Sequence, residues 1–208
     1  MPGPIQLRII SGIVFCVFAI GLIVSGTAPN RTWFNYYSWG VMIVAALSAV
    51  WDTWLWKTWI GQIFSGIPVD LSGTWRGTLA TMWVDPANNT TPPPKPAYIV
   101  IRQTWSKISV VLLTNESNSQ STFASVRSGD IGTSLVYMYI NTPDIQRNKV
   151  SPIHYGSTML VVTGRPATRL KGSYWTSRDS KGSLDLTLRN RLKVDDYDQA
   201  ERLFESAG

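Results

Sequence analysis

The stretch Ser134-Leu-Val-Tyr-Met-Tyr-Ile-Asn141 alternates between two kinds of side chain. Successive residues of a β-strand point to opposite faces of a sheet, so Tyr137, Tyr139 and Asn141 would share one face. The Val, Met and Ile residues between them would share the other face. A period of two therefore predicts a strand with two unlike faces, although periodicity alone leaves open which face points inward.

The same alternation recurs from about residue 70 onward, where Val, Ile, Thr, Tyr and Trp are abundant and turn residues recur at short intervals. About eight segments are predicted to be strands: residues 73–84, 98–105, 108–114, 121–126, 133–141, 155–163, 170–176 and 182–188. Because no helix long enough for a parallel crossover lies between them, the strands should be antiparallel. An all-β, up-and-down barrel is favoured over a sandwich, since closure leaves no exposed edge.

A short amphipathic helix is predicted after the barrel, over residues 195–206. Asp195 and Asp196 stand at its start, where acidic side chains favour a helix N-terminus. Tyr197, Leu203 and Phe204 follow at helical spacing and would form its apolar face.

Two uncharged runs precede the barrel, at residues 9–26 and 32–51. Each is close to the ~20 residues that a helix needs to cross a bilayer. Six of the ten tryptophans lie between residues 33 and 59, as in the aromatic belts of membrane proteins. We therefore predict two N-terminal transmembrane α-helices with an interfacial segment over residues 1–66, and a β-barrel domain over residues 67–208. Arg8 and Lys57 favour the cytoplasmic side for the N-terminus and the barrel.

The composition of the 208-residue chain gives little support to catalysis or metal binding. One Cys and one His leave no set of ligands with metal-site spacing. Nucleophile-elbow, P-loop and HExxH motifs are absent from the sequence. We therefore expect neither an enzyme, nor a metal site, nor a cofactor.

The charge of the chain is uneven and indicates where an anionic partner would bind. The formal net charge is +6, and residues 67–194 contain fifteen basic and seven acidic side chains. If the aromatic strand faces point into the barrel, Tyr rings and Arg178 would line a cavity suited to bases and phosphates. If those faces point outward, they are ordinary solvated surfaces. A membrane-anchored, calycin-like lipid or metabolite carrier and an envelope structural protein remain the alternatives.

Four short motifs add a family resemblance. They are Leu71-Ser-Gly-Thr-Trp-Arg-Gly77, Ile101-Arg-Gln-Thr-Trp105, Leu113-Thr-Asn-Glu-Ser-Asn-Ser119 and Gly172-Ser-Tyr-Trp-Thr-Ser-Arg178. In this order, behind two apolar N-terminal runs, they resemble the SMODS-associating two-transmembrane, β-strand-rich effectors of bacterial cyclic-oligonucleotide-based anti-phage signalling (CBASS). The resemblance covers nearly the whole chain.

The resemblance implies a function in antiviral defence. A partner cyclic-nucleotide synthase would make a cyclic dinucleotide on infection, and the cytoplasmic barrel would bind it. The effector would then form a homo-oligomer and disrupt the bacterial inner membrane through its spans, so that the infected cell dies. The implied partners are thus the cyclic dinucleotide, the lipid bilayer, further copies of the chain and the synthase, without DNA or RNA.

The motifs and the strand parity together nominate six ligand-contacting residues. Tyr139, Tyr174, Thr176 and Arg178 are the first choices, and Arg102 and Trp105 are secondary ones. The aromatic rings would stack on bases and the guanidinium groups would pair with phosphates.

Overall fold

A computed structural model describes residues 4–26, 31–58, 68–86, 89–129, 132–143, 153–178 and 180–206. The chain divides into two compact units. One comprises Met1–Ile67 together with Thr104–Ser106, and the other comprises Pro68–Gln103 together with Lys107–Gly208.

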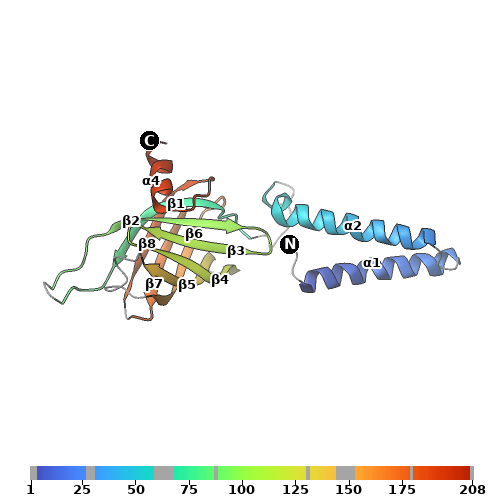
Figure 1. Cartoon of the computed structure of the whole chain (residues 1–208), viewed down its shortest axis with the longest axis horizontal. Helices are drawn as coiled ribbons and strands as arrows, with labels where there is room; N and C mark the ends of the chain where they lie inside the picture. The colour runs from blue at the N-terminus through green and yellow to red at the C-terminus, as the bar shows by residue number, and fades with distance from the viewer. Residues whose placement is uncertain are drawn as a thin grey trace. The chain divides into compact units, whose positions relative to one another are not determined.

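The first unit is built on two antiparallel helices, α1 (Pro4–Ser25) and α2 (Arg31–Thr53), followed by the short 3-10 helix η1 (Leu55–Lys57) (Figure 1). The ring of Phe18 on α1 packs against rings of α2, with centroids 5.8 Å from Trp33 and 5.1 Å from Tyr37. Near the end of α2, the buried Asp52 accepts a hydrogen bond of 2.8 Å from the backbone N–H of Ser106.

Over the residues that the structure describes, neither helix combines the length and the apolarity that crossing a bilayer requires. This finding corrects the prediction of two transmembrane helices and, with it, the prediction of a multi-pass inner-membrane protein. The prediction rested on the length of the runs, the absence of charge and the tryptophan-rich ends, whereas a span also needs sustained apolarity, which Asn35, Ser38 and Ser48 interrupt in α2. The lipid bilayer as a partner was inferred from the same runs and loses that support. Of the predicted interfacial segment, residues 59–67 lie outside the described part of the chain.

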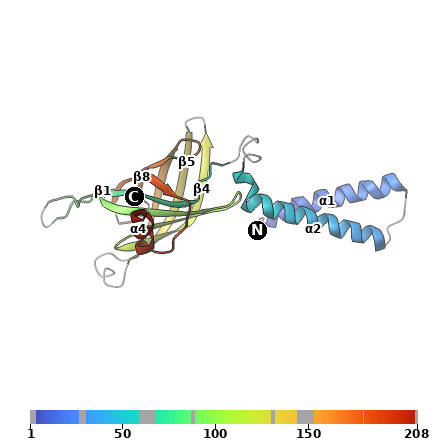
Figure 2. The ribbon, with the colours of Figure 1, turned by 90° about the horizontal axis from the view of Figure 1, so that it is seen from above.

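The second unit is a closed barrel of eight antiparallel strands in sequence order (Figures 1 and 2). The strands are β1 (Gly73–Thr81), β2 (Lys95–Gln103), β3 (Ile108–Thr114), β4 (Ser117–Gly129), β5 (Gly132–Pro143), β6 (His154–Thr163), β7 (Arg169–Thr176) and β8 (Lys181–Asn190). Because β8 pairs back with β1, no edge is left open. The barrel predicted from the alternation is confirmed.

The largest departure from the predicted strands is β4, which begins at Ser117 and ends at Gly129 rather than covering only residues 121–126. Its first residues are Ser, Asn, Ser and Gln, which have low intrinsic strand propensity. They are nevertheless held in the sheet, because β3 pairs with them on one side and β5 on the other. Pairing with two neighbours overrides the local preference.

The predicted C-terminal helix is confirmed as α4 (Tyr197–Glu205). Asp196 caps its N-terminus by accepting a 2.8 Å hydrogen bond from the backbone N–H of Gln199. The helix lies on the outer wall of the barrel, where the ring of Tyr98 on β2 meets the rings of Tyr197 and Phe204 at 5.3 and 5.9 Å (Figure 2). α4 therefore covers the outer face of β2 and β3.

Candidate functional site

The structure resolves which face of each strand points into the barrel. On β5, Tyr137 and Tyr139 are buried at 0% and 4% exposure, whereas Met138 between them is 55% exposed. The aromatic face that includes Asn141 therefore lines the interior, and the Val, Met and Ile face lies outside.

The interior differs between the two ends of the barrel. The end at which Trp75 lies, named the Trp75 end, is lined by apolar side chains: Trp75, Ile99, Ile101, Val110, Leu135, Leu160, Leu170 and Leu186. The opposite end, named the Asn141 end, is lined mainly by polar and aromatic side chains: Ser119, Tyr137, Tyr139, Asn141, His154, Thr158, Tyr174 and Thr176. A polar ligand therefore has hydrogen-bonding partners at the Asn141 end.

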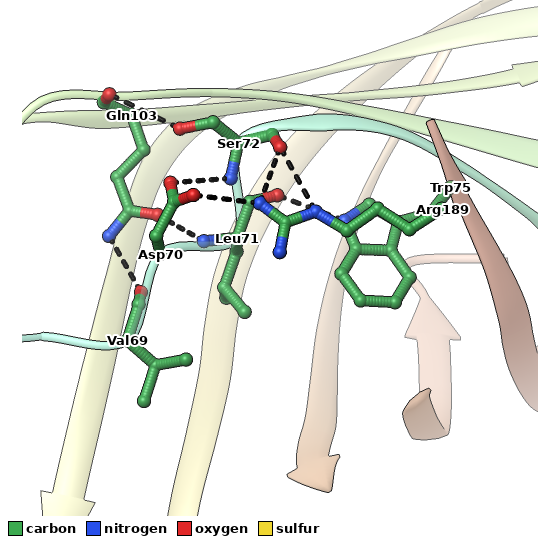
Figure 3. A network of polar contacts seen from close by, with 7 residues as sticks. All are labelled: Val69, Asp70, Leu71, Ser72, Trp75, Gln103 and Arg189. Atoms are coloured by element: carbon green, nitrogen blue, oxygen red, sulfur yellow. Dashed lines mark hydrogen bonds and ion pairs between the residues drawn. The ribbon is translucent and has the colours of Figure 1, made fainter. Parts of the chain in front are cut away.

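The Trp75 end is closed by a polar network around Arg189 (Figure 3). The guanidinium lies over the ring of Trp75, 5.2 Å from its centroid. It also pairs with Asp70 at 2.9 Å and donates to the carbonyl oxygen of Ser72 at 2.6 Å. Trp75 in turn donates its indole N–H to the carbonyl oxygen of Leu71 at 2.9 Å.

Gln103 on β2 completes this network (Figure 3). Its side-chain oxygen accepts from the backbone N–H of Leu71 at 2.8 Å, and its side-chain nitrogen donates to the carbonyl oxygen of Val69 at 3.1 Å. Arg189 and Gln103 thus hold residues 69–72 against the strands. Because these polar groups bond to one another, the network serves to close the barrel.

At the Asn141 end, two tyrosine rings lie against glycines of neighbouring strands. A side chain on Gly156 would collide with the ring of Tyr139, its cross-strand partner. A side chain on Gly182 would come within 2.7 Å of the ring of Tyr174, which is paired with it. Glycine at these two positions leaves room for the aromatic rings inside the barrel.

Burial changes the acid–base properties of these phenols. Loss of solvation raises the pKa of Tyr137 to about 12, and it also raises the pKa values of Tyr139 and Tyr174. The neighbouring Thr158 hydroxyl partly opposes the shift at Tyr137, although the two oxygens do not meet hydrogen-bond geometry. All three phenols are therefore neutral at physiological pH and can donate hydrogen bonds.

Three buried polar atoms inside the barrel have no hydrogen-bond partner within the described chain. They are Oη of Tyr137, Oγ1 of Thr158 and Oδ1 of Asn141. Buried polar groups in native proteins are nearly always paired, and an unpaired one destabilises the fold by about 1–3 kcal/mol. All three lie in the half of the barrel toward the Asn141 end, so this half has hydrogen-bonding groups that the described residues do not use.

Comparison with known families identifies the kind of domain that the barrel forms. The model of the family described as Cap15, cyclic dinucleotide receptor domain, matches residues 66–189. This chain belongs to the Cap15 family. It is also 28% identical over 169 residues to CD-NTase-associated protein 15 of Staphylococcus schleiferi, an alignment that covers 81% of this chain and 87% of the relative.

Membership of the Cap15 family confirms the resemblance to the β-strand-rich CBASS effectors. The matched region contains the whole barrel up to Arg189, so the barrel is the cyclic dinucleotide receptor domain of an anti-phage effector. Such a domain binds its ligand without transforming it and acts through that ligand rather than through a cofactor.

The receptor domain brings three of the six nominated residues to the Asn141 end. Tyr139 and Tyr174 are buried in the interior, and Thr176 is half-buried beside them, with its hydroxyl 3.0 Å from that of Ser180. Arg178 is exposed in the turn between β7 and β8, where its backbone N–H donates to the Thr176 hydroxyl at 3.2 Å. It therefore lies at the rim of this end.

The other two nominated residues lie elsewhere. Arg102 is on the outer face of β2 and forms an ion pair of 2.6 Å with Asp195, just before α4. Trp105 belongs to the first unit, where its ring meets that of Trp51 edge-on at 6.5 Å. The structure does not bring these two side chains together with Tyr139 and Tyr174, and all six assignments stay predictions.

The cations at the Asn141 end lie at its rim. Lys95 begins β2 and forms an ion pair of 2.7 Å with Glu116, while Arg178 and Lys181 are exposed on either side of the β7–β8 turn.

Asn141 and Thr158 were not nominated as ligand contacts. Asn141 shares a strand face with Tyr137 and Tyr139, which is the signal in the sequence that could have found it; Thr158 shares its inward face with no tyrosine, and only the fold places it beside them.

Proposed function

We propose that the Asn141 end of the barrel binds the cyclic dinucleotide. The observation that carries the proposal is the set of unpaired buried atoms on Tyr137, Thr158 and Asn141. Next to them, the rings of Tyr139 and Tyr174 offer flat aromatic surfaces on which bases stack, typically with about 1–3 kcal/mol per base. Arg178 and the other rim cations would pair with the phosphodiester groups.

A cyclic dinucleotide receptor needs a source of its ligand. We propose that a cyclic-nucleotide synthase of the CD-NTase type makes it, as the name of the Staphylococcus schleiferi relative implies for that protein. The receptor domain would then report infection by changing its own assembly state. The ligand can shift this equilibrium only if it binds the assembled receptor more tightly than it binds the monomer.

We propose that the assembled state is a homo-oligomer formed through the outer face of β4, β5 and β6. Four large side chains on this face are about half exposed, namely Phe123, Met138, Met159 and Val161. They are neighbours, because Phe123 pairs with Met138 and because Met159 and Val161 lie on the adjacent strand. A cluster of this kind is larger than the scattered apolar residues of ordinary surfaces.

A second copy of the chain is the occupant that fits this face. A closed barrel has no strand edge to extend, and α4 already covers β2 and β3. The outer face of β7 and β8 carries the charged group of Arg169, Lys171 and Asp185. Apart from Arg127 on β4, the outward residues of these three strands are uncharged, so two copies of the face meet with little like-charge repulsion on a chain with a net charge of +6.

The binding proposal is tested with the purified full chain and a panel of purine and pyrimidine cyclic dinucleotides. At least one should raise the midpoint of thermal unfolding, since a ligand at 100 times its Kd stabilises the native state by about 2.7 kcal/mol. Tyr139→Ala and Tyr174→Ala should lose this shift. Tyr36→Ala, on α2 outside the barrel and 66% exposed, is the matched control and should keep it.

Two outcomes would count against this site. A shift that survives Tyr139→Ala and Tyr174→Ala would place the ligand elsewhere. Stabilisation by fatty acids but by none of the cyclic dinucleotides would instead favour a calycin-like carrier that uses the aliphatic Trp75 end.

The assembly proposal is tested by sedimentation with and without the stabilising cyclic dinucleotide. Met138→Lys should bind it with unchanged affinity but remain a monomer, because the lysine places a charge in the centre of the apolar face. Thr78→Lys, on the exposed outer face of β1, is the matched control and should still assemble. Normal assembly of Met138→Lys would refute this interface without affecting the binding site.

A further inference from the structure

The amide of Asn141 is held in one orientation by two hydroxyl groups. Asn141 lies near the end of β5 and is 7% exposed. Its side-chain nitrogen donates to the hydroxyl oxygen of Ser117 at 3.0 Å and to that of Ser119 at 2.7 Å. Both hydrogens of the NH₂ group are thereby used.

A chain of hydrogen bonds explains why the nitrogen, rather than the oxygen, faces these serines. The Thr114 hydroxyl donates its hydrogen to the carbonyl oxygen of Ser117 at 3.0 Å. The Ser117 hydroxyl, 3.3 Å from the Thr114 oxygen, is then the donor of that pair. Its oxygen is left as an acceptor toward Asn141, so the amide turns its nitrogen to β4.

The side-chain oxygen of Asn141 is consequently left without a partner among the described residues, in a buried position. A carbonyl oxygen can only accept hydrogen bonds, so the group that satisfies it must bring an N–H or an O–H. A phosphodiester has only acceptor oxygens and a negative charge, and the partial negative charge of the amide oxygen would repel it.

Within a cyclic dinucleotide, the donors are the N–H groups of the bases and the hydroxyl groups of the riboses. Asn141 follows Tyr139 on the same inward face of β5, two residues along the strand. A base stacked on the ring of Tyr139 would turn its edge toward the neighbouring side chains of this face. The base edge is therefore the nearer donor.

We propose that Asn141 is a specificity-determining residue that accepts a hydrogen bond from a base N–H of the cyclic dinucleotide. The ligand then enters the barrel bases first and keeps its phosphates at the rim near Lys95, Arg178 and Lys181. This inference rests on the proposed binding site. It adds the orientation of the ligand and the chemical group that is recognised.

The test compares cyclic di-UMP, cyclic di-GMP, cyclic di-AMP and cyclic di-CMP with analogues in which methyl groups replace every hydrogen on one donor nitrogen of each base, so that this nitrogen no longer donates. For the compound that binds, methylation should weaken binding to the wild-type chain by about ten- to a hundredfold. Asn141→Leu should bind the unmethylated compound more weakly by a similar factor and should no longer distinguish it from its methylated analogue. If the effects of mutation and methylation on binding free energy are not additive, Asn141 and the base N–H contact each other.

Three further measurements make the outcomes distinguishable. Asn118→Leu removes an exposed amide from the outer face of β4 and should leave the discrimination intact. Ser119→Ala releases one of the two bonds that fix the amide and should reduce the discrimination without abolishing binding. The unfolding midpoint of each variant without ligand shows whether the barrel still folds.

Equal binding of the methylated and unmethylated compounds by the wild-type chain would overturn the inference and leave the proposed site standing. The inference would also be overturned if Asn141→Leu removed the discrimination against a 2′-O-methylated ribose but kept the discrimination against a methylated base. If none of the four compounds and no mixed cyclic dinucleotide binds at all, the proposed function itself fails.

Discussion

The ring of Tyr139 occupies the space that a side chain on Gly156, its cross-strand partner, would need. Glycine at position 156 therefore makes room for the aromatic lining of the Asn141 end, and it also avoids a contact with the backbone oxygen of Trp175. At Gly182 an added side chain would meet the ring of Tyr174, but it would first collide with the backbone oxygen of Ala80.

Gly156→Ala should displace the Tyr139 ring and weaken binding of the cyclic dinucleotide at least tenfold. Overpacking of this kind typically destabilises a fold by about 1–3 kcal/mol, which denaturant unfolding would measure. Gly129→Ala is the control, because a methyl group there meets nothing within 4 Å. Unchanged binding by Gly156→Ala would mean that the Tyr139 ring does not contact the ligand.

Thr158→Val should change stability and binding in opposite directions. Valine has nearly the same shape but lacks the unpaired buried hydroxyl, so the free energy of unfolding without ligand should rise by about 1 kcal/mol. Binding should weaken, because the ligand loses a partner. A variant that loses stability would show that the Thr158 hydroxyl is already satisfied in the free protein. Calorimetry and denaturant unfolding on the same samples supply both quantities.

Alkaline pH should destabilise the barrel through Tyr137. The pKa of this phenol is about 12 in the folded chain, against 10.0 for an unperturbed tyrosine, so between these values the unfolded chain releases a proton that the native chain retains. The stabilisation is complete below pH 10 and is lost as the pH rises toward 12, by roughly 2–3 kcal/mol at most.

In Tyr137→Phe the free energy of unfolding should fall less between pH 10 and pH 12 than in the wild-type chain. Tyr155→Phe, on the outer face, should behave like the wild type. Phenolate absorbance followed against pH should show one late-titrating phenol fewer in Tyr137→Phe, while Tyr139 and Tyr174, whose pKa values are also raised, still titrate late. An unchanged amplitude of the late titration in Tyr137→Phe would show that Tyr137 is not among the late-titrating groups.

Arg189→Lys should weaken the closure of the Trp75 end. Lysine retains the charge but cannot pair with Asp70 and the Ser72 carbonyl while also lying flat over the Trp75 ring. We expect a loss of about 1–3 kcal/mol in the free energy of unfolding, with ligand affinity at the other end unchanged. Arg127→Lys, at a partly exposed position on β4, should change stability by less than about 0.5 kcal/mol. Equal stability of the two variants would show that the Arg189 network contributes little.

Absence of charge proved a poor guide at the N-terminus. It predicted membrane spans at residues 9–26 and 32–51, and these runs do form helices that include most of their residues. Helix formation depends on local preference, whereas membrane crossing depends on the summed apolarity of about 20 residues, to which Asn35, Ser38 and Ser48 contribute unfavourably. The helical state was therefore predictable, but its interpretation as a span was wrong.

The candidate site was only partly predictable. Tyr139, Tyr174 and Thr176 could be nominated because they share strand faces with other polar and aromatic residues. Asn141 could not be connected to Ser117 and Ser119, because their contact depends on the register between β4 and β5, where Ser119 lies opposite Asn141. The unpaired oxygen that makes Asn141 informative appears only once that register is known.

Alternation, turn residues and short motifs are local properties of the chain, so the antiparallel eight-strand barrel, the C-terminal helix and the family could all be predicted from residues alone. Which face of each strand points inward, which rings lie over which glycines and which buried polar atoms are left unpaired became known from the folded barrel. These features depend on how strands far apart in sequence align when the barrel closes, and a shift of one residue in that alignment would move every side chain of a strand to its other face.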